Sequence, residues 1–369
     1  MRIAFLTRID AFTKFGGDTF QIQMYKKYLE SSNHIVDIFF DLSIPISYDH
    51  YVIVNLDRPL EFIIYYNQLK LNTLLEKTSI LTIHHSYEQI NFYEKNYRTG
   101  LEKAILGLSR TFHGREKVKN LIRGLSHRKL LKYAIAQFFL NTKEIQKEAL
   151  NLCSVIGIAE GEIETINKDY EIAIENYSIV KNGVNVVSNF PHLDSEGERS
   201  IDILIAGRVE PRKNTLNIAR YFSNKNYNVK FVGALNDNFP EYCNEFKNLV
   251  SKSQNITYLG KVNPEEMISL YCQSKIHLSG SWFEVASLVD LESYAYGCHV
   301  ISSVFGHTKD YLGENIKYIN PNQFDSLEKL VDELLVTPND LASQFAYILE
   351  NYTWKKSAEN LEKFFSLAI

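Results

Sequence analysis

Short apolar runs alternate with helical segments along almost the whole chain, and no other feature of the sequence constrains the fold as strongly. The pattern begins with an apolar run at 3–6, a Gly-bearing loop at 15–18 and a helical segment that continues through Leu29. Further runs of strand length in the first half lie at 34–40, 52–55, 79–83 and 133–140. Buried strands that alternate with helices form a parallel sheet covered on both faces, so the sequence predicts an α/β fold.

Residues 187–200 divide the chain, because this polar, turn-rich segment has no apolar periodicity. A second series of strand-like runs follows at 201–206, 228–232, 256–259, 276–279, 299–303 and 316–319. A length of 369 residues also fits about two domains. We therefore expect two doubly wound, Rossmann-like domains, 1–188 and 189–369, with a ligand-binding cleft between them at the carboxyl ends of the strands.

Composition and charge exclude several classes of protein. Forty Lys and Arg against 44 Asp and Glu give a net charge of −4, whereas nucleic-acid binders carry a basic excess. The four cysteines form no CxxC pair, which fits a reducing cytosol. Arg8 and Asp10 interrupt the N-terminal apolar run, and no stretch reaches the ~18 apolar residues of a membrane span. We expect a cytoplasmic protein with no nucleic-acid partner.

The first candidate site is a basic loop after the strand predicted at 201–206. It reads Gly-Arg-Val-Glu-Pro-Arg-Lys-Asn from Gly207 and contains Arg208 and Lys213, five positions apart. A glycine at a strand end allows a sharp turn, and two cations beside a helix N-terminus suit a diphosphate. The alternative is an ordinary solvated charged loop.

The second candidate site is a pair of glutamates, Glu284 and Glu292, eight positions apart. If a helix begins near Ser287, Glu284 lies in the preceding loop and Glu292 lies in the helix beside Leu291. A carboxylate on a largely apolar helix is costly without a partner, and the hydroxyl pair of a ribose is one such partner. The alternative makes Glu284 a loop charge near the helix N-terminus and Glu292 a surface residue.

The order of these motifs is similar to that of one enzyme family. The segment from Glu284 to Gly297 keeps the register of a Glu-x7-Glu signature. Further landmarks in the same order are Gly16-Gly17, Val180-Lys181-Asn182-Gly183-Val184-Asn185, Gly207-Arg208 with Lys213, Leu259-Gly260-Lys261-Val262 and Tyr352-Thr353-Trp354. The chain resembles the retaining glycosyltransferases of family 4, which have the GT-B fold. The resemblance covers almost the whole chain and implies a last helix that crosses back to the N-terminal domain.

The resemblance implies roles for the matched residues of the second half. Arg208 and Lys213 would bind the diphosphate of a nucleotide-sugar donor, and Glu292 would hold the ribose hydroxyls. Glu284 would face the donor sugar as a catalytic residue. With two cations on the diphosphate and no Asp-x-Asp motif in the chain, we expect neither a metal nor another cofactor.

The backbone amides of Ser287 and Leu288 would touch phosphate or sugar, at a place where the family has Gly-Leu. Ser287 is the main departure from the family pattern, because it adds a side chain where the backbone normally approaches the ligand closely. The replacement of Phe-Gly by Ala286-Ser287 also bears on the choice of donor sugar.

His84 follows the strand predicted at 79–83, where the family often keeps a histidine that reaches the donor sugar, and it is the second catalytic candidate. His85 is its rival, since alternation along a strand sends neighbouring rings in different directions. Outside this context a strand-end histidine is more often structural. Gly16 and Gly17 would let their loop approach the donor or acceptor, or would simply form a tight turn.

A basic stretch marks the predicted first domain. Residues 98–132 hold ten Lys and Arg against two Glu, and the apolar residues Val118, Leu121, Ile122 and Leu125 follow helical spacing. One interpretation is a segment that lies on an anionic membrane surface. The others are direct binding of an anionic acceptor and a solvated face beside the cleft.

The resemblance predicts a retaining glycosyltransferase that moves a sugar from a nucleoside diphosphate-sugar to a glycan or lipid-linked acceptor, in the synthesis of a cell-surface polysaccharide or glycoconjugate. Such an enzyme would work in the cytoplasm, either free or peripheral on the inner face of the cell membrane. Two alternatives use the same fold. One is a non-catalytic binding or partner subunit, which Ala286 and Ser287 favour, and the other is a nucleotide-sugar epimerase.

Overall fold

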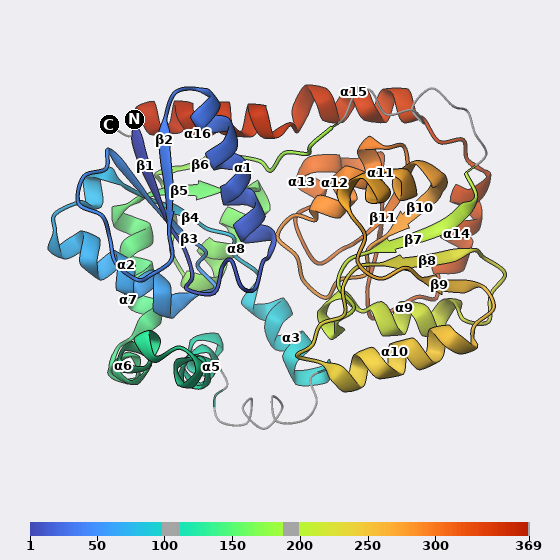
Figure 1. The fold of residues 1–369 in the computed structure, drawn as a ribbon, viewed down its shortest axis with the longest axis horizontal. Helices are drawn as coiled ribbons and strands as arrows, with labels where there is room; N and C mark the ends of the chain where they lie inside the picture. Colours follow the sequence, from blue (N-terminus) through green and yellow to red (C-terminus); the bar gives the residue numbers. More distant parts are fainter. Residues whose placement is uncertain (98–108, 110, 187–198, 368–369) are drawn as a thin grey trace. The chain divides into compact units, whose positions relative to one another are not determined.

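The computed structural model describes residues 1–97, 109, 111–186 and 199–367. The chain forms two compact units, one of Met1–Gly183 with Trp354–Ile369 and one of Val184–Thr353 (Figure 1). Each unit is built on one parallel six-stranded sheet, as the alternating pattern predicts. The boundary predicted after residue 188 and most of the predicted connection lie outside the described residues, as do 98–108 and 110 of the basic stretch.

The first sheet has the strand order β2-β1-β3-β4-β5-β6. Its strands are β1 (Arg2–Leu6), β2 (Ile35–Phe39), β3 (His50–Val54), β4 (Thr78–Leu81), β5 (Ser154–Gly157) and β6 (Tyr177–Ile179). Every residue of β3 is buried, as expected for a central strand covered on both faces. The strand order reverses between β1 and β3, so right-handed crossovers place the helices after these two strands on opposite faces.

The helices of the first unit include one from the far end of the chain. They are α1 (Gly17–Ser31), α2 (Pro59–Leu71), α3 (Tyr87–Tyr97), α5 (Phe112–Ser126), α6 (Arg128–Ala136), α7 (Thr142–Leu152), α8 (Glu160–Tyr170) and α16 (Trp354–Leu367). Trp354, fully buried at the start of α16, packs edge-on against Tyr25 of α1 with ring centroids 5.8 Å apart. This contact holds α16 beside α1 (Figure 1).

The strand predicted at 133–140 is wrong. That segment is the end of α6 followed by a 3-10 turn, η2 (Gln137–Phe139). Its aromatic and β-branched residues favour a strand, but Leu130 and Ala134 lie one helical turn apart and are buried together. The strand that pairs with β4 is β5, a run of four residues that is not among the predicted strands.

The second sheet has the order β12-β11-β10-β7-β8-β9. Its strands are β7 (Ile201–Ala206), β8 (Val229–Val232), β9 (Ile256–Tyr258), β10 (Ser274–Leu278), β11 (His299–Ser303) and β12 (Lys317–Ile319). Its helices are α9 (Thr215–Phe222), α10 (Pro240–Lys252), α11 (Pro264–Gln273), α12 (Leu288–Ala295), α13 (Lys309–Leu312), α14 (Leu327–Val336) and α15 (Leu341–Asn351). All six strands coincide with predicted runs to within two residues at either end. Among the described residues, none of the helices has the length and apolar character needed to cross a membrane.

Candidate functional site

The loops after β7 and β10 meet where the strand order of the second sheet reverses. From β7 the chain proceeds to β8 and β9 on one side, and then to β10, β11 and β12 on the other. Doubly wound sheets bind ligands at such switch points. The loop after β7 carries Arg208 and Lys213, and the loop after β10 carries Glu284. The structure therefore gathers three predicted site residues at one edge of this sheet.

Two glycines fix the start of the basic loop. Gly207 directly follows β7 with φ at +148°, and Gly233 directly follows β8 with φ at +140°. A Cβ on Gly233 would lie 2.0 Å from the carbonyl oxygen of Gly207, so a side chain at this position would displace the loop. The chain then makes a 3-10 turn, η3 (Pro211–Lys213), just before α9. The basic side chains thus lie beside a helix N-terminus, where an anion is favoured.

Two cations hold the carboxylate of Glu284. It accepts hydrogen bonds from Nη1 of Arg212 at 2.9 Å and from Nζ of Lys213. Arg212 also pairs with Glu210 at 3.1 Å, and Arg208, with half of its side chain exposed, lies 3.6 Å from Glu210. Burial disfavours the charge of Arg212, but Glu284 and Glu210 outweigh it and raise the pKa of the guanidinium. Three cations against two carboxylates leave an excess of one positive charge.

Arg212 was not among the predicted site residues. Besides its ion pairs it donates to the carbonyl oxygen of Phe283 at 3.2 Å, and its own carbonyl accepts from the amide of Trp282 at 2.9 Å. Arg212 therefore ties the loop after β7 to the loop after β10. In the sequence, Arg212 is visible only as a third cation directly beside Lys213. The fold is needed to show that its side chain pairs with Glu284.

Glu292 is a partly desolvated carboxylate on α12, as the helical pattern predicts. The hydroxyl of Tyr271 donates to it at 3.2 Å. Burial raises the pKa of Glu292 to about 7, and the bond from Tyr271 offsets only part of this effect. Two positions earlier, Asp290 accepts from Ser302 at 2.5 Å and lies 3.1 Å from Nε2 of His277. These contacts anchor α12 to β10 and β11 and so fix the position of Glu292.

Ser287 caps α12, and Leu288 is its first residue. The amide of Ser287 donates to Oγ1 of Thr308 at a distance of 3.4 Å, which makes a long hydrogen bond. Oγ of Ser287 is buried and has no hydrogen-bond partner among the residues that the structure describes. The ligand contacts predicted for these two amides stay predictions.

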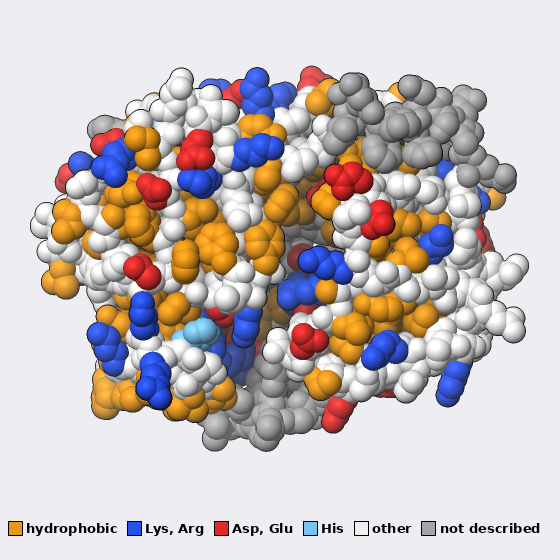
Figure 2. Space-filling view, in the orientation of Figure 1, with side chains coloured by type: hydrophobic (Ala, Val, Ile, Leu, Met, Phe, Trp, Pro, Cys, Tyr) orange, Lys and Arg blue, Asp and Glu red, His pale blue; other side chains and the backbone are white. Residues whose placement is uncertain are grey.

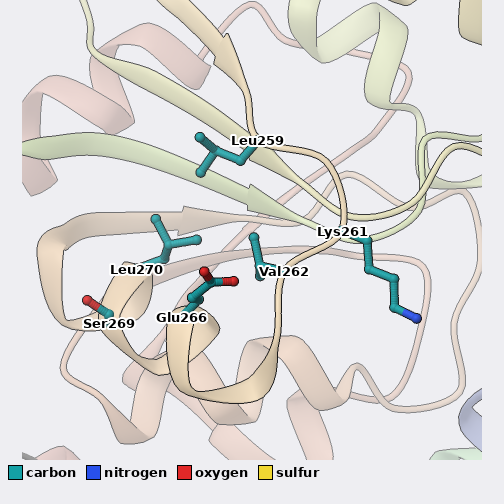
Figure 3. Close-up of a pocket in the computed structure, with 6 residues that line it drawn as sticks. All are labelled: Leu259, Lys261, Val262, Glu266, Ser269 and Leu270. Carbon is teal, nitrogen blue, oxygen red and sulfur yellow. The ribbon is translucent and has the colours of Figure 1, made fainter.

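A pocket of about 470 Å³ opens in the second unit between the end of β9 and α11 (Figure 3). Its lining residues are Leu259, Lys261, Val262, Glu266, Ser269 and Leu270. Lys261 points away from the carboxylate of Glu266, while the aliphatic side chains form the walls (Figure 3). Leu270 precedes Tyr271, the partner of Glu292, so one helix connects the pocket to this carboxylate.

The switch point of the first sheet lies between β1 and β3, and a buried ion-pair network fills it. Arg8, just after β1, pairs with Asp10 at 2.8 Å and with Asp18 at 2.8 Å. Gly16 caps α1 with an extended backbone, and Gly17 begins the helix. Neither glycine has a left-handed conformation. Both interpretations of this pair, a close approach to the donor or acceptor and a tight turn, stay predictions.

His84 is fully buried between two carboxylates. Its Nδ1 lies 2.9 Å from Asp57 and its Nε2 lies 2.9 Å from Asp169. Burial disfavours the charge, but the two aspartates outweigh it and raise the pKa of His84 to about 9. A charged ring with both nitrogens bonded cannot accept a proton, so in this geometry it organises its loop. Its contact with a donor sugar stays a prediction.

The expectation that alternation separates His84 from His85 is wrong. β4 ends at Leu81, and Ile83 has φ at +44°, so both rings lie past the strand. Nδ1 of His85 lies 2.6 Å from the second oxygen of Asp57, the same carboxylate that binds His84. The aspartates could not be found from the sequence, because they lie 27 and 85 positions from His84.

Residues 194–352 match the sequence model of the family described as Glycosyl transferases group 1. This segment, which is less than half of the chain, resembles a group 1 glycosyltransferase domain, and we call it the group 1 domain. The basic loop, both predicted glutamates and the pocket of Figure 3 all lie inside the group 1 domain.

Solved structures support the same fold for the whole chain. A sucrose-phosphate synthase from Thermosynechococcus elongatus is 14% identical with a TM-score of 0.69, covering 100% of this chain and 98% of that one. The Anabaena protein Alr3699/HepE, solved with UDP, is 12% identical with a TM-score of 0.66 and full coverage of both chains. The lipopolysaccharide outer core galactosyltransferase WaaB is 15% identical with a TM-score of 0.58 and full coverage of both chains. The predicted α/β fold of the GT-B type is confirmed.

One relative by sequence is an uncharacterized 41.2 kDa protein in the cps region of Klebsiella pneumoniae. It is 22% identical over 214 residues, which make up 53% of this chain and 57% of that protein. The chain therefore matches little more than half the length of this relative.

The charge of His84 leads to a prediction about stability. The folded pKa of about 9 lies above the ordinary value of 6.5, so the stabilisation is complete below pH 6.5 and is lost as the pH rises through 9. A shift of this size corresponds to roughly 3 kcal/mol. We expect wild type and His84→Gln to differ most in the free energy of unfolding near pH 6 and least near pH 10, measured by urea unfolding. A difference that does not change with pH would contradict a charged His84.

Proposed function

We propose that the chain transfers a sugar from a nucleoside diphosphate-sugar to a glycan or lipid-linked acceptor, with retention of the anomeric configuration. The observation that carries the proposal is the cluster of Arg208, Arg212 and Lys213 with Glu284 at the switch point of the group 1 domain. HepE was solved with UDP and glucose, and the register of Glu284 and Glu292 supports retention. The cps region of the Klebsiella relative supports a part in polysaccharide synthesis.

The leaving group of such a reaction is a diphosphate, and its negative charge must be stabilised as the glycosidic bond breaks. We assign this task to Arg208 and Lys213. The half-exposed guanidinium of Arg208 can meet phosphate oxygens directly, whereas Lys213 is paired with Glu284. Arg212 holds the same carboxylate, so it can keep Glu284 neutralised when Lys213 turns to the diphosphate. In this proposal Arg212 positions Glu284, and the cations replace a metal ion.

The nucleoside would occupy the space between Glu292 and the pocket of Figure 3. In the free protein Glu292 accepts from Tyr271, and the two hydroxyls of a ribose would add donors that offset the cost of its burial. Leu259, Val262 and Leu270 offer apolar walls of the kind that a base requires. The pocket lies at the carboxyl end of β9, on the same edge of the sheet as the basic loop.

Substitutions should separate leaving-group stabilisation from donor binding. We expect Lys213→Ala to lower kcat by about a hundredfold or more, because it removes a charge that acts in the transition state. We expect Glu292→Ala to raise the KM for the donor about tenfold to a hundredfold, because it removes charged hydrogen bonds to the ribose. Steady-state transfer with the donor that a thermal-shift screen of nucleoside diphosphates selects would measure both effects.

Lys252→Ala is the matched control, since Lys252 is an exposed cation at the end of α10. Wild-type transfer should persist in EDTA. Full activity in both Lys213→Ala and Glu292→Ala would contradict the assignment. Donor binding without any transfer or hydrolysis would support a non-catalytic subunit instead, and a new sugar formed without acceptor would indicate an epimerase.

The raised pKa of Glu292 predicts a pH dependence of donor affinity. The carboxyl group is protonated below about pH 7 and is then a poorer acceptor for the ribose hydroxyls. We therefore expect the affinity for an intact nucleotide-sugar, whose diphosphate does not titrate in this range, to rise several-fold from pH 6 to pH 8. Calorimetric titration should show this rise in wild type and no rise in Glu292→Gln. Parallel pH profiles of the two proteins would contradict the assignment of Glu292.

A further inference from the structure

Five large apolar side chains are exposed on one helical hairpin of the first unit, formed by α5, α6 and η2. These side chains are Ile122 (50% exposed), Leu125 (71%), Ile135 (52%), Phe138 (48%) and Phe139 (87%). Figure 2 shows hydrophobic and basic side chains next to one another over α5 and α6. Exposed apolar clusters are costly in water and mark interaction surfaces.

The two helices of the hairpin pack tightly on each other. The exposed apolar side chains therefore lie on a well-ordered element. Leu130 and Ala134 are fully buried. A Cβ on Gly124 of α5 would lie 3.0 Å from the Cα of Leu131 of α6, so the two helices are in close contact. Asn120 of α5 donates to Gln137 of η2 at 3.1 Å. The hairpin therefore has one inner and one outer side.

The charged side chains of the hairpin are basic apart from Glu116 of α5, which is buried and pairs with Lys119. From residue 117 to residue 143 the chain has no Asp or Glu. The same segment contains seven cations, namely Lys117, Lys119, Arg123, Arg128, Lys129, Lys132 and Lys143. Of these, Arg128, Lys129 and Lys132 are exposed on α6, the helix that leads to Phe138 and Phe139. The partner must therefore offer negative charge and accept aromatic side chains at the same place.

The hairpin is rigidly joined to the rest of its unit. Arg123, which adjoins the exposed Ile122, donates to Glu61 of α2 and lies 3.8 Å from Asp10. Asp10 in turn binds Arg8 in the loop that leads to α1. A surface held by buried ion pairs can dock without first becoming ordered, which lowers the cost of binding.

We propose that this surface docks on an anionic lipid bilayer. We call it the docking face and define it by Ile122, Leu125, Ile135, Phe138 and Phe139 with Arg128, Lys129 and Lys132. Its apolar side chains would enter the boundary between headgroups and acyl chains, and the cations would meet anionic headgroups. A polyanion without an apolar phase, such as a nucleic acid, would leave the five apolar side chains in water. None of these residues belongs to the candidate site, so this proposal and the proposed function can fail separately.

Sedimentation of the full chain with phosphatidylcholine vesicles, with and without phosphatidylglycerol, tests the proposal. We expect binding to the anionic vesicles only, and a decrease in binding as salt is added. The triple substitution Arg128→Glu, Lys129→Glu, Lys132→Glu should weaken binding about a hundredfold or more. Leu125→Glu combined with Phe139→Glu should abolish detectable binding, because it places charge where the acyl chains would lie.

Leu71→Glu, at an exposed leucine that ends α2, and Lys252→Glu are the matched controls and should bind like wild type. Thermal unfolding of each variant, expected to match wild type, shows that the fold is intact. Equal binding to neutral vesicles, no binding at all, or wild-type binding by the Leu125 and Phe139 variant would overturn the proposal. If wild type instead self-associates in ultracentrifugation and that variant does not, the face belongs to a second copy of the chain and the membrane proposal is wrong.

Discussion

Arg212 and Lys213 hold the carboxylate of Glu284, and the functional account depends on this interaction. It connects two loops that leave different strands of the second sheet, β7 and β10, at the point where the strand order reverses. The excess cation gives this edge a positive charge that suits a diphosphate, and Glu284 keeps the cations in place until a ligand arrives. Without Glu284 the two side chains would repel each other, and the bonds of Arg212 to Phe283 and Trp282 would remain to connect the loops.

Buried carboxylates have the same organising function in the first unit. Asp57 and Asp169 fix the ring of His84, and Glu162 accepts hydrogen bonds from the Thr82 hydroxyl and from the amide of His84. Asp57 lies in the loop after β3, whereas Glu162 and Asp169 both lie on α8, so the loop after β4 is determined by tertiary contacts. The network at Arg8 fixes the loop after β1 in the same way. Both sheets thus carry strand-end loops whose conformation depends on ion pairs.

The sequence predicts most of the fold, because strand and helix periodicity are local properties. It fails at 133–140, where residues with a preference for strands form part of a helix that packs on α5. The loops are harder to predict. The positions of Arg208, Lys213, Glu284 and Glu292 follow from motif register, but Arg212, Asp57 and Asp169 are defined by partners far along the chain. The orientation of His84 was missed for a local reason, since β4 ends earlier than its apolar run suggests.

The central claim is that the basic loop of the group 1 domain recognises a diphosphate. Calorimetric titration of wild type with nucleoside mono- and diphosphates of each base tests it most directly. The account predicts that, for one base, the diphosphate binds at least about tenfold more tightly than the monophosphate, with a difference that shrinks as salt is added. Equal affinities for mono- and diphosphates, or no binding for any base, would contradict it.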